Sequence, residues 1–124
     1  MKLLYSNETT RQQCTSLKSA EKLFGGDKQL AVSLLAVSLL ARINALEQAC
    51  VIMDIITMPT FHFHKLHGKL DGYFAIDVKS RRDKWRIILC PLDESEERFD
   101  PCHIDEIAAE VKIIEIREVS AHYE

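Results

Sequence analysis

The segment that decides the fold is residues 61–92, FHFHKLHGKLDGYFAIDVKSRRDKWRIILCPL. It predicts three short strands, over 61–66, 73–78 and 85–92, because aromatic and β-branched residues lie between turns of Gly, Asp, Ser and charged residues. It is also the one clearly basic segment, since Lys and Arg outnumber Asp and Glu by seven to three over residues 61–90. A positive sheet that also carries His62, His64 and His67 is suited to a ligand with phosphates.

The residues before this segment predict one strand and two helices. A short strand is expected over 2–6, followed by a helix that Thr9 or Thr10 caps and that ends after Phe24, at two glycines. Asp27 is expected to cap a longer, apolar helix over 28–49 that packs both on the first helix and on the sheet.

The residues after residue 49 complete the pattern. Residues 52–59 are expected to form an irregular link, because Pro59 keeps Met58 out of the helical region. An acidic loop over 93–101 precedes a short helix that Asp100 or Pro101 opens and that runs to residue 110, and a last strand covers 111–119. The whole chain, 1–124, is therefore predicted to be a single α+β domain. Its N-terminal strand and two helices pack on a mostly antiparallel sheet of about four to five strands.

Composition limits the cellular context. The 124 residues are enough to bury a core without disulfides or metal. The four cysteines are scattered with no C-x-x-C pair, which is typical of buried thiols in a reducing cytoplasm. The longest apolar run, residues 30–41, contains two serines and is shorter than the roughly 20 residues that cross a bilayer. The protein is therefore expected to be cytoplasmic, with no membrane partner.

Charge is distributed unevenly along the chain. The net charge is −3, yet residues 91–124 hold three basic and eleven acidic side chains. An acidic total argues against a general nucleic-acid binder, because binding to the backbone depends on neutralising phosphates. Any such activity must be local to the basic middle segment.

A motif in the middle segment resembles a known family. It reads His64-x-Leu66-x-Gly68-x-x-x-Gly72-Tyr73-Phe74-x-Ile76, followed by Trp85-Arg86-Ile87-Ile88. It is similar to the core of HigB-like toxins of the RelE/ParE superfamily, which are small bacterial ribonucleases of toxin–antitoxin pairs. The resemblance implies a RelE-like fold and a metal-independent endoribonuclease that cleaves mRNA at the ribosome. It also implies a helix-turn-helix antitoxin as partner and no cofactor; a homodimer is left open.

Four residues are the catalytic candidates. Cleaving RNA without metal needs a base for the 2′-hydroxyl, a cation for the phosphorane and an acid for the leaving oxygen. His64 matches the motif histidine, which implies a general base or phosphate donor, and Arg86 stands where the family's arginine does, with a planar fork that fits two phosphate oxygens. His122 and Tyr123 resemble the carboxy-terminal His-Tyr of one branch of the family.

A second set of residues is predicted to hold the RNA backbone without reading its sequence. It consists of Lys65, Arg81, Arg82 and Lys84, of which the last three cluster in one turn.

Two alternatives to an active ribonuclease remain open, and the first is a binding module with the toxin fold but no catalysis. If residues 79–84 join a regular hairpin, Asp77 lies opposite Arg86, and a cross-strand salt bridge explains both residues. Ala75 and Asp77 also stand where RelE-like relatives carry catalytic lysines, which favours a binding module with the toxin fold but no catalysis.

The other alternative is a metalloprotein. His62-x-His64-x-x-His67 places two imidazoles on one side of a strand with a third beyond it, and Cys102 or His103 is a candidate fourth ligand.

Overall fold

The structure is a computed structural model that describes residues 1–25 and 29–121. The elements follow one another as β1 Lys2–Tyr5, α1 Glu8–Thr15, α2 Leu17–Leu23, α3 Gln29–Gln48, α4 Met53–Ile56, the 3₁₀ turn η1 Pro59–Phe61, β2 His64–Lys65, the 3₁₀ turn η2 Gly68–Leu70, β3 Phe74–Asp77, β4 Arg86–Leu92, α5 Ile104–Ile107 and β5 Ile113–Ser120.

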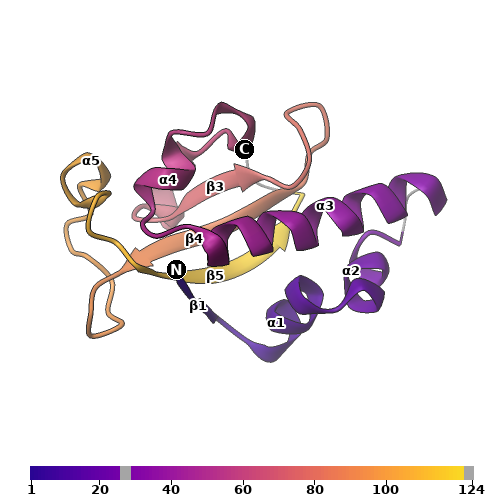
Figure 1. The fold of residues 1–124 in the computed structure, drawn as a ribbon, viewed down its shortest axis with the longest axis horizontal. Coiled ribbons are helices and arrows are strands. Elements are labelled where there is room, and N and C mark those ends of the chain that lie inside the picture. Colours follow the sequence, from indigo (N-terminus) through magenta and orange to yellow (C-terminus); the bar gives the residue numbers. More distant parts are fainter. Residues whose placement is uncertain (26–28, 122–124) are drawn as a thin grey trace.

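A five-stranded sheet in the order β1-β5-β4-β3-β2 forms the centre of the domain (Figure 1). The edge strand β1 pairs with β5 in parallel, and the remaining neighbours pair antiparallel. The predicted α+β class, with an N-terminal strand, helices and a mostly antiparallel sheet, is therefore confirmed, and the arrangement is consistent with a RelE-like fold.

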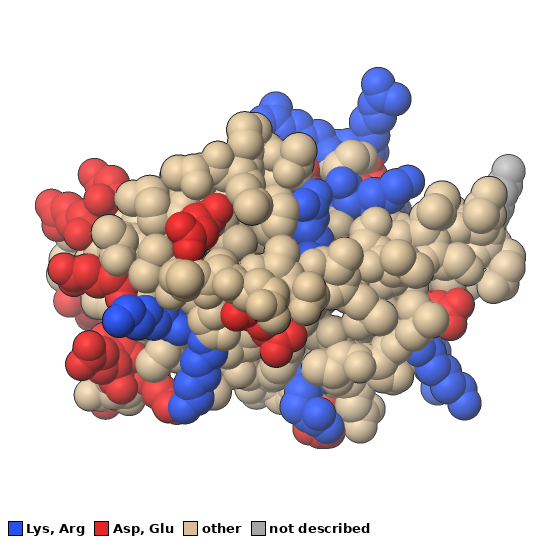
Figure 2. Space-filling view, in the orientation of Figure 1, with Lys and Arg blue, Asp and Glu red and all other residues tan. Residues whose placement is uncertain are grey.

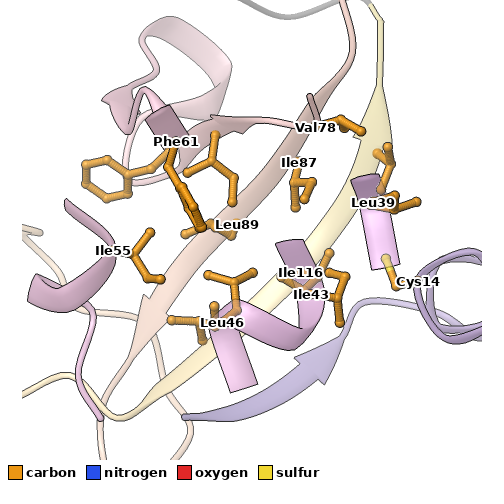
Figure 3. Close-up of a cluster of buried hydrophobic side chains, with 14 of the residues drawn as sticks. Cys14, Leu39, Ile43, Leu46, Ile55, Phe61, Val78, Ile87, Leu89 and Ile116 are labelled. Carbon is orange, nitrogen blue, oxygen red and sulfur yellow. The ribbon is translucent and has the colours of Figure 1, made fainter. Parts of the chain in front are cut away.

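The main core lies between the helices and one face of this sheet (Figure 3). Because side chains alternate along a strand, Ile87, Leu89 and Ile116 point toward the helices, where Leu39 and Ile43 of α3 meet them. The opposite face carries a smaller cluster, formed by Leu66, Leu70, Tyr73, Ala75, Ile88, Cys90 and Leu92. The sheet therefore has one face covered by helices and a second, thinner face on which side chains from β3 and β4 meet those of the segment between β2 and β3.

The first predicted helix is in fact two helices. Ser16 has an extended backbone (φ −127°, ψ 122°), ends α1 and, through its hydroxyl, caps α2 by accepting a bond from Ser19 N at 3.3 Å. The prediction that Thr9 or Thr10 caps the first helix was wrong, because Asn7 Oδ1 accepts from Thr10 N at 2.8 Å. Serine and asparagine side chains compete with the helical backbone for its amides, so they favour helix starts.

The region before β3 is less extended than predicted. The expected link over 52–59 contains α4 and begins η1, and the expected strand over 61–66 shrinks to the two residues of β2. The cause is His62, which ends η1 in the left-handed conformation (φ 50°, ψ 50°) and turns the chain before pairing begins.

The other elements differ from the predictions mainly at their ends. The strands predicted over 73–78, 85–92 and 111–119 are β3, β4 and β5 with bounds shifted by one or two residues. The helix predicted from Asp100 or Pro101 to residue 110 is shorter: α5 begins at Ile104 and ends at Ile107.

Helix α3 is more exposed than a core helix usually is. Among the described residues it is the one helix long and apolar enough, by length and composition alone, to cross a membrane, a test that buried helices of soluble proteins also meet. Its inner face is buried, yet Leu30 is 73% and Val37 58% exposed. The cytoplasmic location stays a prediction.

Candidate functional site

The β3–β4 hairpin brings an acidic side chain, Asp77, and a basic one, Arg86, together at the base of the loop that joins the two strands. Asp77 and Arg86 are direct partners in the antiparallel register. Arg86 Nε lies 3.3 Å from Asp77 Oδ1, and the Asp77 carboxylate is almost completely buried, with 1% of the side chain exposed. The cross-strand salt bridge that the sequence left open is therefore confirmed.

Arg86 also organises the loop above it. Its Nη1 donates to the carbonyls of Asp83 and Trp85, both at 2.8 Å, and Asp83 in turn accepts from the amides of Ser80 and Trp85, both at 2.9 Å. Only 7% of Arg86 is exposed. The guanidinium is thus engaged by Asp77 and by loop carbonyls, and it presents little surface to a phosphate.

The Asp77 carboxylate has a second partner, the imidazole of His62. His62 Nδ1 lies 3.4 Å from Asp77 Oδ1, the same oxygen that faces Arg86. One buried carboxylate therefore connects a guanidinium on β4 with an imidazole on the turn before β2.

Arg42 of α3 contacts both the end of β3, which carries Asp77, and the turn that carries His62. Its Nε donates to the carbonyl of Asp77 at 3.1 Å, and its Nη2 donates to that of Thr60 at 3.0 Å. Its guanidinium also lies over the Phe61 ring, 4.1 Å from the centroid. Burial lowers the pKa of Arg42, although Asp77 and Asp83 act in the opposite direction. This side chain fixes the turn that carries His62 against the end of β3.

His64 lies next to His62. The two rings are 4.6 Å apart between centroids and inclined by 32°. His64 Nδ1 is 2.8 Å from the carbonyl oxygen of His62 and must donate to it, because a carbonyl can only accept. Since His64 pairs with Ala75, it shares the thinner face of the sheet with Asp77 and Arg86.

Exposed positive charge lies beside the group formed by His62, His64, Asp77 and Arg86. Arg81, Arg82 and Lys84 are exposed on the β3–β4 loop. Figure 2 shows Lys and Arg gathered at the edge where this loop lies, whereas acidic side chains crowd the end that carries α5. A hollow of about 410 Å³, lined by Pro59, Thr60, Asp77, Lys79, Ser80 and Arg81, opens beside Asp77. Its lining combines Asp77 with two cations of the loop, Lys79 and Arg81.

No protein-family model matches this chain, and no curated protein matches its sequence. The resemblance to HigB-like toxins therefore rests on the motif between His64 and Ile88 and on the arrangement of helices and strands.

Some predicted site residues are brought together and others are not. His64 and Arg86 are linked through His62 and Asp77, and the loop that carries Arg81, Arg82 and Lys84 lies beside them. His122 and Tyr123 lie outside the described residues. The catalytic and RNA-binding roles of all these residues stay predictions.

Lys65 faces a different hollow. This hollow, of about 480 Å³, is also lined by Arg98 and Asp71. Arg98 and Arg117 both lie against the Tyr73 ring, with Cζ 4.4 Å and 5.0 Å from its centroid. The sequence did not single out these two arginines; they place positive charge against Tyr73, beside a hollow that is also lined by Asp71 and Asp100.

The sequence indicates His62 and Asp77 but does not predict the contact between them, and it does not single out Arg42. The strand register signalled Asp77 as a partner of Arg86, but its contact with His62 depends on a left-handed turn that no local pattern predicts. From the sequence, His62 is one of three histidines on a positive sheet and one of three candidate metal ligands, but not a catalytic candidate.

The metal alternative finds no support in residues 1–25 and 29–121. No group of three His, Cys, Asp or Glu side chains in this part of the chain is placed to hold a metal ion.

Proposed function

We propose that this chain is the toxin of a type II toxin–antitoxin pair, an endoribonuclease that cleaves mRNA at the ribosome without metal. The observation that carries the proposal is the placement of two neighbouring imidazoles, tied to a buried carboxylate, beside a loop with three exposed cations. Imidazole can take and return a proton near neutral pH, and cations can hold a phosphate chain, which are the two needs of metal-free RNA cleavage.

In this proposal the cations of the β3–β4 loop contact the RNA in place of Arg86. Arg81, Arg82 and Lys84 hold backbone phosphates, while Arg86 shapes the loop from below and balances the charge of Asp77. The role of Arg86 is thus positional, in contrast to the phosphate contact that the resemblance implies.

The partner and location follow from the resemblance. A helix-turn-helix antitoxin would bind and silence the toxin in the cytoplasm. The free thiols of Cys14, Cys50, Cys90 and Cys102 agree with a reducing compartment.

Inducible expression in bacteria tests the proposal. The wild-type chain should arrest growth, and purified protein added to translating ribosomes should cleave a labelled mRNA to give 2′,3′-cyclic phosphate ends.

The salt dependence of RNA binding tests the role of the loop cations. The double variant Arg81→Ala, Arg82→Ala should bind RNA more weakly, with the slope of log affinity against log salt reduced by about 0.7 for each phosphate that is no longer neutralised. Its matched control, Lys18→Ala, Lys22→Ala, removes two exposed charges from α2 and should leave the slope unchanged.

A toxin-fold binding module without catalysis is the second candidate. The observation that favours it is the burial of Arg86 in its ion pair, together with Ala75 and Asp77 at positions where relatives carry lysines. Normal growth while soluble, folded protein accumulates, combined with intact mRNA in the ribosome assay, would favour this candidate and contradict the ribonuclease.

A further inference from the structure

We propose that His62 is the general base of the site and that Asp77 positions it. This inference rests on the proposed ribonuclease function and goes beyond it, because it assigns the proton transfer to a residue that lies outside the family motif.

The contact with Asp77 selects the tautomer of the His62 ring. A carboxylate can only accept, so Nδ1, 3.4 Å from Asp77 Oδ1, carries the proton. In the neutral ring the lone pair then lies on Nε2, which makes no hydrogen bond to any described residue. One third of the His62 side chain is exposed, 33%, whereas the carboxylate behind it is 1% exposed. A buried acid behind an accessible imidazole is the arrangement that orients a base toward a substrate.

His64 differs from His62 in that its free ring nitrogen is buried. Its Nδ1 donates to the His62 carbonyl, so its lone pair also lies on Nε2, but that atom is buried and meets no partner among the described residues. A nitrogen that is closed off from solvent cannot reach a 2′-hydroxyl on a bound RNA strand. Of the two imidazoles, His62 is therefore the one that can accept the proton.

The backbone of His62 supports a functional role. Its φ of 50° lies in the left-handed region, which few residues other than glycine adopt, although asparagine, aspartate and histidine do so more often than the rest. Strained residues of this kind cluster at functional sites, where the side chain is needed in spite of the strain. Here the strained turn aims the ring at Asp77 and the carbonyl at His64.

The reaction step balances without a further reagent. His62 Nε2 takes the proton of the RNA 2′-hydroxyl, and the 2′-oxygen forms a bond to the adjacent phosphorus. The bond from this phosphorus to the 5′-oxygen breaks, and the 5′-oxygen leaves with a proton from water. The products are a 2′,3′-cyclic phosphate and a 5′-hydroxyl, and the His62 proton returns to solvent.

Cleavage kinetics with a labelled mRNA on translating ribosomes test the assignment. His62→Gly suits the left-handed backbone and leaves a space for a free ring. It should lower kcat by about 10²- to 10⁴-fold, the usual contribution of a general base, with KM within about threefold of wild type. Added imidazole should restore much of the lost rate. The matched variant His64→Asn keeps a donor to the His62 carbonyl but has no second ring nitrogen, and it should lose less than tenfold.

Asp77→Asn tests the positioning residue in the same assay. It should lower kcat with little change in KM, and imidazole should not restore the rate because the His62 ring is still present. Wild-type rates for folded His62→Gly, or a large loss confined to His64→Asn, would overturn the assignment and leave the ribonuclease proposal intact. Absence of cleavage by the wild-type chain would overturn both.

Discussion

Replacing Arg86 by alanine is expected to destabilise the protein more than any change to the exposed basic residues. The change leaves the Asp77 carboxylate, 1% exposed, without its guanidinium partner, and breaking a buried ion pair from one side costs about 3–5 kcal/mol. It also removes the two 2.8 Å hydrogen bonds that Arg86 donates to the carbonyls of Asp83 and Trp85. Water can reach part of the opened loop, so we expect the free energy of unfolding to fall by about 3–5 kcal/mol in total. For a chain of this length that corresponds to a fall in Tm of roughly 10–20 °C.

Urea unfolding measured by fluorescence is the suitable assay. Trp85 is the sole tryptophan, it adjoins the loop, and its ring packs edge-on against Phe24 with the centroids 4.8 Å apart. Arg82→Ala, in the same loop but exposed, is the control and should stay within about 0.5 kcal/mol of wild type.

A double variant separates the ion pair from the other contacts. Asp77→Asn combined with Arg86→Ala should cost less than the two single changes added together, because no unpaired charge is left in the core. A decrease below about 1 kcal/mol for Arg86→Ala would refute the reasoning. It would mean that the guanidinium is free in solution and available to a phosphate.

Three further predictions concern other parts of the chain. Gly72→Ala should lower the free energy of unfolding in urea melts by about 1–2 kcal/mol, because φ is +89°, a conformation in which alanine is strained, while the Arg98 guanidinium, 2.7 Å from the new Cβ, can move aside; an unchanged melt would contradict this. Burial raises the pKa of the Cys14 thiol to about 12, so at pH 8 a thiol reagent should modify exposed Cys50 first and reach Cys14 only as the protein unfolds; equal rates, followed by mass spectrometry, would count against it. Burial raises the pKa of Tyr5 to about 12 from an ordinary 10, so the folded state holds its proton more tightly than the unfolded state. Stability should therefore fall as pH rises from about 10 to about 12, and urea melts across this range measure the fall.

The central hairpin could be predicted from the sequence because its signals are local. Residues 73–78 and 85–92 combine β-forming side chains with a polar turn, and this pattern gives both strands and the register that places Asp77 opposite Arg86. The break between α1 and α2 could not be predicted in the same way. Serine favours a cap over a helix interior, yet Ser33 and Ser38 lie inside α3, so a serine alone does not mark a break in a helix.

Only the part of the candidate site that depends on local signals could be predicted. Cations of the β3–β4 loop and the opposition of Asp77 and Arg86 follow from composition and strand pairing. The ring of His62 reaches Asp77 only because the backbone turns left-handed there, and Arg42, from a distant helix, secures that turn. Contacts of this type depend on tertiary structure, which leaves no periodic signal in the sequence.

The order of the strands has a consequence for the order of folding. Strand β5 lies between β4 and β1, and Lys2 N donates to the carbonyl of Lys112 at 2.9 Å, so β1 pairs with a segment far away in the sequence. Until β5 is in place, β1 has no strand to pair with and β4 keeps an open edge. Because contacts between distant segments carry a large entropic cost, we expect the β1–β5 edge to form after the β3–β4 hairpin.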